Sequence, residues 1–374
     1  MSVYNQLIGQ GHLIETLTAA VKAAASGEDS QEMTHAWIFT GPPGSGRSSA
    51  AIAFAQALVC KNGGCGSCND CVTAKSGAHP DVEILKSEGL SIKIDEIREL
   101  LTRTVWAPSM GGWRVVVMED ADRLTESAAN ALLKAIEEPG LRTVWLLCAP
   151  TLHDILTTIR SRCRHIQLHT PADEEVAKFL ISKHQIAPKM ADFAARVSQG
   201  HIGRARHLAT NEDVRNRRSA ILSIPSQLNS VASAYIQAQK LVDLANAESE
   251  AISEALDEKE YEALSTALGK GSGKALKELE KEQKSRATRI TRDTLDGALL
   301  DLATFYRDVL LVQGGHDDSM INAELADQIN KIAANTQPQR TLAKMDAIMN
   351  ARENLQRNGA PLLVMEALMC ELIK

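Results

Sequence analysis

The stretch FTGPPGSGRSSAA, residues 39–51, has the residue types of a phosphate-binding loop with one exception. Its candidate nucleotide-binding residues are Gly41, Pro42, Pro43, Gly44, Ser45, Gly46, Arg47, Ser48 and Ser49. In the pattern G-x-x-x-x-G-K-[ST], backbone N–H groups of the glycine-rich turn cradle phosphate, and the hydroxyl ligates Mg²⁺. Arg47 stands where lysine is expected, and its planar fork differs from a compact ammonium. The stretch therefore predicts phosphate contact, but it leaves open whether a nucleotide is turned over. The alternative is a plain strand–turn–helix with glycine and proline as turn residues.

Four of the seven cysteines crowd into twelve residues. Cys60, Cys65, Cys68 and Cys71 have the spacing C-x4-C-x2-C-x2-C. Four thiolates at such spacing can surround Zn²⁺ as a tetrahedron, which leaves no open position for catalysis. Free thiols or a redox motif are the alternatives. The spacing predicts a structural zinc site.

An apolar run at 113–118 ends in Glu119 and Asp120. After a phosphate loop, carboxylates at a strand end can hold Mg²⁺ and orient water. The alternative is a solvated strand end. The order of the motifs favours a nucleotide-linked acidic element.

The segment TIRSRCRHI contains Arg160, Arg162 and Arg164. Alternate residues of a strand face one way, so a strand here would place the three arginines on one face. Such a face is either a solvated basic patch or the source of an arginine that enters a neighbour's nucleotide site.

Short apolar runs alternate with helical patterns in the first part of the chain. Strands are predicted at 35–39, 81–85, 113–118, 143–148 and 165–168, and helices at 48–60, 94–105 and 125–138. This alternation indicates a parallel sheet with helices on both faces. Residues 169–212 predict a small helical domain. Later patterns predict a helix over 288–313 and two helices within 342–373, with a break at 358–361 and a flexible interruption at 269–274.

Composition narrows the function classes. The 374 residues carry a formal net charge of −6, with 41 Lys and Arg against 47 Asp and Glu, so no global positive field attracts nucleic acid. No apolar run approaches the roughly 18 residues of a membrane span. The segment MSVYNQLIGQ lacks the features of an export signal, so a cytoplasmic protein is expected.

Several motifs in one order carry a family resemblance. Together these motifs resemble the AAA+ clamp-loader subunits of bacterial DNA polymerase III, and within them the delta-prime branch. The motifs are THAWIFTGPPGSGRSS, the CGxCxxC cluster, VVVMEDADRLTESAANALLKAIEEP and TIRSRC. The specific match covers about residues 7–210. The resemblance implies an α/β AAA+ module at 1–168 with a zinc-binding insertion at 60–71. A small helical lid domain at 169–212 and an all-α collar domain at 213–374 would follow.

The resemblance also implies function and partners. In this family the collars join five subunits, among them gamma/tau and delta, into a hetero-pentamer. The ring uses ATP to open a sliding clamp and place it on primed DNA within the DNA polymerase III holoenzyme, in the cytoplasm at the nucleoid-associated replisome. Arg162 would reach into the ATP site of the adjacent motor subunit as an arginine finger. The four cysteines would hold the family's Zn²⁺.

The chain departs from the pattern of a motor subunit at four places. These are Arg47 in place of lysine, the reversed order Glu119–Asp120, Ala149 or Pro150 at the first sensor, and Gly203 at the second sensor with Arg204 one step away. A degenerate ATP/Mg²⁺ site with an intact finger predicts a subunit that assists hydrolysis without performing it. One alternative is a gamma/tau-like motor that hydrolyses ATP with Arg47. Another is an unrelated zinc-dependent regulatory or DNA-binding protein, which the acidic balance disfavours.

Overall fold

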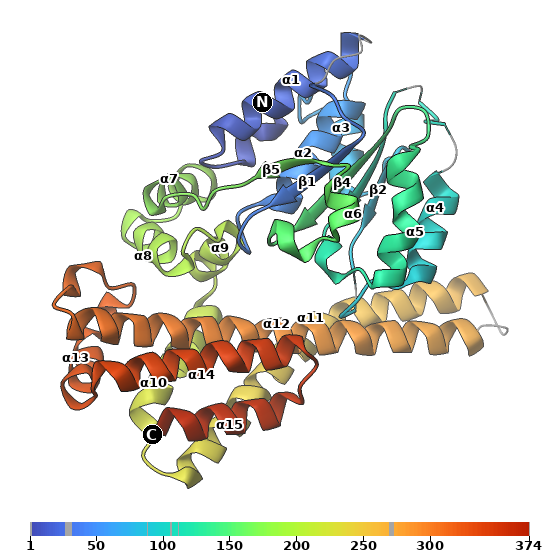
Figure 1. Ribbon diagram of the computed structural model, residues 1–374. Helices are drawn as coiled ribbons and strands as arrows, with labels where there is room; N and C mark the ends of the chain where they lie inside the picture. Colours follow the sequence, from blue (N-terminus) through green and yellow to red (C-terminus); the bar gives the residue numbers. More distant parts are fainter. Residues whose placement is uncertain are drawn as a thin grey trace. The chain divides into compact units, whose positions relative to one another are not determined.

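The computed structural model describes residues 2–26, 32–87, 89–104, 107–110, 112–268 and 273–373 (Figure 1). The chain divides into two compact units, Met1–Thr210 and Asn211–Lys374. Within the described ranges, no helix is long and apolar enough to cross a membrane.

The first unit is built on a five-stranded parallel sheet. Its order is β2-β3-β4-β1-β5, with β1 at Ala36–Thr40, β2 at Val82–Leu85, β3 at Arg114–Met118, β4 at Thr143–Ala149 and β5 at Arg164–Gln167. In the central pairs, Trp37 lies opposite Leu146 and Val116 lies opposite Trp145. The predicted parallel α/β sheet is confirmed, and each of its strands begins and ends within one residue of the prediction.

Alternate residues of each strand enter different cores, because side chains of a strand point to opposite faces. On β4, Val144 and Leu146 pack in one core, and Trp145 and Leu147 in the other. The first core is covered by η1 (Val3–Gln6), α1 (Gly11–Ser26), α2 (Arg47–Val59) and α3 (Asn69–Ser76). The second is covered by α4 (Ile94–Thr104), η2 (Ala121–Arg123), α5 (Glu126–Glu137), η3 (Leu152–Asp154) and α6 (Thr157–Arg160). Figure 1 shows these two helical layers on either side of the sheet.

Helix α5 shows how local sequence sets an element. The Thr125 hydroxyl accepts a hydrogen bond from the N–H of Ala128 and caps the helix. Buried residues at one helical stripe, Ala128, Ala129, Leu132 and Ile136, face the second core. The helix ends just before Pro139 and Gly140, as predicted. Helix α4 agrees with the prediction through Thr104, and Val105 lies outside the described residues.

Three short helices follow the sheet in the first unit. They are α7 (Asp173–His184), α8 (Pro188–Ser198) and α9 (Ile202–Thr210). Three acidic residues in the first turn of α7 complement the helix dipole. The boundary at 168/169 between the sheet and these helices stays a prediction.

In its described residues, the second unit contains only helices. They are α10 (Glu212–Gln227), α11 (Val231–Leu268), α12 (Gly273–Gln313), η5 (Asp317–Ser319), η6 (Ala323–Leu325), α13 (Ala326–Asn335), α14 (Pro338–Gln356) and α15 (Pro361–Ile373). The predicted break at 358–361 is confirmed, and Asn358 adopts a left-handed φ of 65° there. The helix predicted over 288–313 begins earlier, at Gly273. Of the predicted interruption at 269–274, residues 269–272 lie outside the described residues.

A buried ion network holds this second unit together. The Arg218 Nε of α10 lies 2.9 Å from Oδ1 of Asp301 on α12, and its Nη1 lies 3.2 Å from Oε1 of Glu324. Its Nη2 donates to the side-chain oxygen of Asn322. Asp308 is fully buried and accepts the Asn322 N–H at 2.7 Å. These contacts tie α10, α12 and the turn before α13.

Candidate functional site

The phosphate loop lies at the carboxyl end of β1. Strand β1 ends at Thr40 and α2 begins at Arg47, with the glycine-rich turn between them. Gly44 and Gly46 have φ values of 83° and 92°, which side chains other than glycine rarely adopt. Gly46 is the N-cap of α2, so N–H groups of the first turn of the helix border the loop. The local geometry of a phosphate-binding loop is therefore present.

Arg47 binds its own loop. Its Nη1 donates a hydrogen bond to the carbonyl oxygen of Gly41 at 2.5 Å. The hydroxyl of Ser45 is buried and has no hydrogen-bond partner in the described part of the chain. Ser48 and Ser49 lie in the first turn of α2, where Ser48 is partly exposed and Ser49 is exposed. The cation that stands at the lysine position thus already has an acceptor inside the turn.

A histidine that sequence reasoning missed packs on the loop. A Cβ at Gly44 would lie 2.0 Å from Cγ of His201, which means that the ring fills the space beside this glycine. His201 precedes α9, and its Nδ1 accepts the N–H of Arg204 at 3.1 Å. Burial and then the charge of Arg204 lower the pKa of His201, and Arg47 contributes in the same direction. Gly203, at the predicted second-sensor position, adds no side chain beside the loop.

The acidic pair lies at the same edge of the sheet. Glu119 and Asp120 follow β3 directly, and Oε2 of Glu119 lies 3.7 Å from Nζ of Lys86. Burial raises the pKa of the neighbouring Asp122; the charge of Asp120 adds to this rise and Arg47 opposes it. Loop and acidic pair therefore meet at the carboxyl ends of β1 and β3.

The first-sensor position offers no polar side chain. Ala149 ends β4 and lies opposite Thr40 in the sheet. The next residue, Pro150, accepts the N–H of Gly41 through its carbonyl at 3.1 Å. At this edge of the sheet, Arg47 is thus engaged on Gly41, His201 lies against Gly44, and Ala149 offers no polar side chain.

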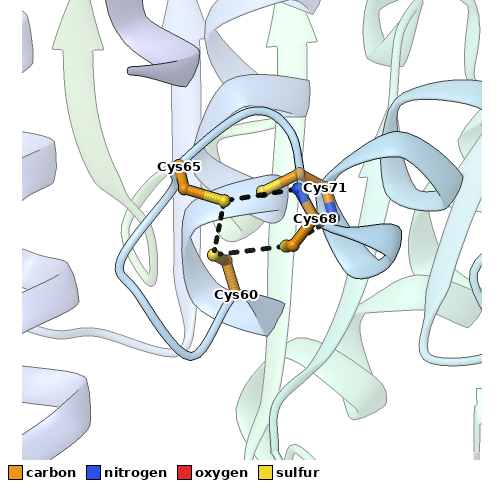
Figure 2. Close-up of side chains that lie close together, drawn as sticks. All are labelled: Cys60, Cys65, Cys68 and Cys71. Carbon is orange, nitrogen blue, oxygen red and sulfur yellow. Dashed lines mark hydrogen bonds between the residues drawn. The ribbon is translucent and has the colours of Figure 1, made fainter. Parts of the chain in front are cut away.

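The four cysteines form one cluster beside α2 and α3 (Figure 2). Their sulfur atoms all lie within 4.8 Å of one another. The Sγ of Cys60 is 3.8 Å from that of Cys65 and 3.6 Å from that of Cys68. Two ligands of a tetrahedral zinc–thiolate centre stand about 3.8 Å apart, which follows from a Zn–S bond of about 2.3 Å. The cluster can hold a metal ion.

Backbone N–H groups favour the thiolate forms of Cys60 and Cys65, whereas burial raises the pKa of Cys71. The N–H of Asn62 donates to Cys60 Sγ at 3.4 Å, and that of Gly66 donates to Cys71 Sγ at 3.3 Å. Backbone N–H groups of Ser67 and Cys68 lower the pKa of Cys65 to about 6. The helices position this set, because Cys60 is the C-cap of α2 and Cys68 is the N-cap of α3.

The three arginines do not share a strand face. Arg160 ends α6, and the N–H of Arg162 donates to the Ile159 carbonyl at 3.0 Å in a turn. Pairing with β1 begins only at Arg164, opposite Trp37. The strand-like interpretation of 160–164 was wrong, because these turn hydrogen bonds occupy the backbone before the sheet begins.

Arg162 lies at the amino-terminal edge of the sheet. Its side chain is 40% exposed, and its Nη2 lies 2.7 Å from Oε1 of Glu137. Its Nη1 donates to the carbonyl of Thr158 at 2.8 Å and to the hydroxyl of Ser161 at 3.1 Å. It borders a cleft of about 390 Å³, whose other lining residues are Met33, Thr34, His35, Trp113, Pro139, Gly140, Arg142, Thr143 and Arg164.

Two protein-family comparisons cover most of the chain. The family described as "DNA polymerase III, delta subunit" matches residues 16–172, and "DNA polymerase III, delta subunit, C terminal" matches residues 258–372. The DNA polymerase III subunit delta' of Bacillus subtilis is 25% identical over 336 residues, which cover 88% of each chain. The chain belongs to the DNA polymerase III delta-prime family. It has the clamp-loader subunit role of that family, and membership of the family implies other clamp-loader subunits, such as gamma/tau, as partners.

Partial relatives show where the similarity is concentrated. The delta' subunit of Pseudomonas aeruginosa is 38% identical over 135 residues, or 34% of this chain and 41% of the relative. The gamma/tau subunit of Mycobacterium tuberculosis is 31% identical over 167 residues, or 43% of this chain and 28% of the relative. Of these three relatives, only a delta' subunit matches along most of the length, so delta-prime is better supported than the gamma/tau alternative.

Proposed function

We propose that this delta-prime-type chain supplies Arg162 to the ATP site of a neighbouring subunit and does not hydrolyse ATP itself. It would do so in a hetero-pentamer with gamma/tau and delta that places the sliding clamp on primed DNA, at the nucleoid-associated replisome. One contrast carries the proposal. Both guanidiniums bond to their own chain, but that of Arg162 is 40% exposed on a turn at the amino-terminal edge of the sheet, whereas that of Arg47 donates back into the phosphate loop itself.

The altered nucleotide site supports the non-hydrolytic part of the proposal. A motor subunit needs a cation on the β- and γ-phosphates and a polar group near the γ-phosphate. Here Arg47 is engaged by the Gly41 carbonyl, and Ala149 offers no polar atom on its side chain. His201 occupies the space beside Gly44. ATP and Mg²⁺ at this loop would therefore be bound without productive geometry.

We further propose that the metal of the cysteine cluster is Zn²⁺ with a structural role. Four sulfur ligands fill a tetrahedral zinc site, and soft thiolates select zinc over hard cations. The site would fasten the insertion at 60–71 to the AAA+ module at 1–168. The lid at 169–212 and the collar at 213–374 complete the proposed division, with the collar as the assembly element.

The deciding experiment measures ATP turnover by the reconstituted clamp loader with Arg162→Ala. We expect turnover to fall strongly, because arginine fingers contribute on the order of 10³-fold or more at a site that depends on them. Other sites in the ring would keep a residual rate. Arg160→Ala, two residues away at the end of α6, is the matched control and should leave turnover unchanged. Unchanged turnover with Arg162→Ala would refute the finger assignment.

The motor alternative predicts a different result with the chain alone. It is favoured by the gamma/tau similarity and by the retained Ser48, Glu119 and Asp120. Steady-state hydrolysis by the purified chain, beside Arg47→Lys, tests it. We expect no turnover from the native chain. Turnover that disappears with Asp120→Asn would establish a motor that works with Arg47.

A further inference from the structure

The Arg162 guanidinium is held at three points by its own chain. Its Nη2 meets Glu137 at 2.7 Å, and its Nη1 meets the Thr158 carbonyl and the Ser161 hydroxyl at 2.8 and 3.1 Å. A guanidinium has five N–H donors. Within the described residues, these contacts engage three of them, so two stay available to a ligand outside the chain.

Glu137 is the acidic member of this arrangement. It is the last residue of α5, and its side chain is 44% exposed beside the 40% exposed Arg162. The other charged side chains that line the cleft with Arg162 are basic, namely Arg142 and Arg164. Like charges repel at such distances. A carboxylate on Arg162 offsets that repulsion and keeps its guanidinium in the cleft.

Arg164 already has other contacts. Its Nη1 donates to the carbonyl of Glu32 at 2.7 Å, and its guanidinium lies 4.8 Å from the centre of the Trp37 ring. The Glu137 carboxylate therefore acts on Arg162, which projects from a turn rather than from a strand. A long side chain on a turn samples many rotamers unless something holds it.

We propose that Glu137 is a positioning residue for Arg162. It holds the guanidinium in one orientation, with its remaining donors ready for the phosphate of a nucleotide bound to the neighbouring subunit. This inference rests on the proposed finger role of Arg162. Glu137 does not contact the phosphate itself. It lowers the conformational entropy that the Arg162 side chain loses when the transition state forms at the neighbour's ATP site.

The test measures ATP turnover by the reconstituted clamp loader with Glu137→Gln, which keeps the shape of the side chain and removes its charge. We expect kcat to fall about twofold to fivefold, the range of a partly exposed ion pair. The KM for ATP should stay unchanged, because ATP is bound by the neighbouring subunit. Added salt should shrink the difference from the native ring, since exposed ion pairs are screened. Glu138→Gln, the exposed next residue, is the matched control and should change neither value.

A double-mutant cycle separates positioning from a merely structural role. With Arg162→Ala already present, Glu137→Gln should cause no further loss, because its target is gone. A loss of the same size in that background, or a rise in turnover with Glu137→Gln alone, would overturn the inference. An unchanged kcat would do the same. If Arg162→Ala itself leaves turnover intact, the finger proposal fails first and the role of Glu137 falls with it.

Discussion

Substituting Gly44 by alanine tests the packing of His201 on the phosphate loop. At φ of 83°, any residue with a Cβ costs roughly 1–2 kcal/mol. The new Cβ would also lie 2.0 Å from Cγ of His201, far inside the carbon–carbon optimum of about 3.5–4.0 Å. Overpacking of this kind costs about 1–3 kcal/mol. Gly44→Ala should therefore lower the free energy of unfolding by roughly 2–5 kcal/mol.

Gly46 provides a matched control in the same loop. Its φ is 92°, and a Cβ there would have no atom within 4 Å apart from those of the residue itself and its two chain neighbours. Gly46→Ala should therefore cost only the backbone part, roughly 1–2 kcal/mol. The difference between the two variants isolates the contact with His201. In a His201→Ala background the difference should disappear, because the ring that opposes the Cβ is gone.

Urea unfolding followed by tryptophan fluorescence measures these differences. The tryptophans are at 37, 106, 113 and 145, all before the end of the first unit at Thr210, so the signal reports the unit that holds the loop. Equal midpoints and slopes for Gly44→Ala and Gly46→Ala would refute the packing of His201 beside Gly44. An undiminished difference in the His201→Ala background would refute it as well.

Three further predictions use other parts of the chain. Cys65→Ser combined with Cys68→Ser should release the bound metal and lower the melting temperature. Metal analysis and calorimetry measure these changes, with Cys370→Ser as the control. A native chain that contains no metal and is as stable as the double variant would contradict this. Burial and Arg204 lower the pKa of His201 in the folded chain. Its contribution to stability is therefore complete above the unfolded pKa of about 6.5 and is lost as pH falls through the folded pKa. His201→Ala should flatten the pH dependence of the unfolding free energy in that pH range. Arg218→Ala removes the buried guanidinium that pairs with Asp301 and should destabilise the second unit by about 3–5 kcal/mol in urea unfolding followed by circular dichroism. Arg217→Ala, which removes a more exposed pair with Glu248, should cost less than about 1 kcal/mol; equal losses would show that burial is not the cause.

The fold was predictable where the signal is local. The three central strands, β3, β4 and β1, are short apolar runs with both faces buried, so their pattern needs no alternation. The loop around Gly44 and the cysteine cluster depend on spacing within twelve residues or fewer, and local spacing survives folding. Helix α5 was predictable because its cap, its apolar stripe and its Pro-Gly stop all agree.

The missed features depend on contacts between distant segments. His201 reaches Gly44 across more than 150 residues, and nothing in the composition around it indicates that approach. Glu137 ends a helix and Arg162 lies on a turn, and β4 separates them in the sequence. Their side chains come into contact only once β4 has joined the sheet. The error at Arg160–Arg164 has the opposite origin, because alternation suggested a strand where turn hydrogen bonds decide the backbone.

The topology separates the two sites that the proposed function distinguishes. In a parallel sheet, every loop after a strand lies at one edge and every loop before a strand lies at the other. The phosphate loop follows β1, whereas Arg162 precedes β5, so a strand of five residues separates them by about 16 Å. Arginine in place of lysine at position 47 thus changes the phosphate loop at one edge of the sheet and leaves the turn of Arg162 at the other edge unchanged. The partner that holds Arg162 is the end of α5, whose packing depends on the second core and not on the loop. Substitutions in the loop therefore leave the packing of Arg162 unchanged, which the proposed finger role needs.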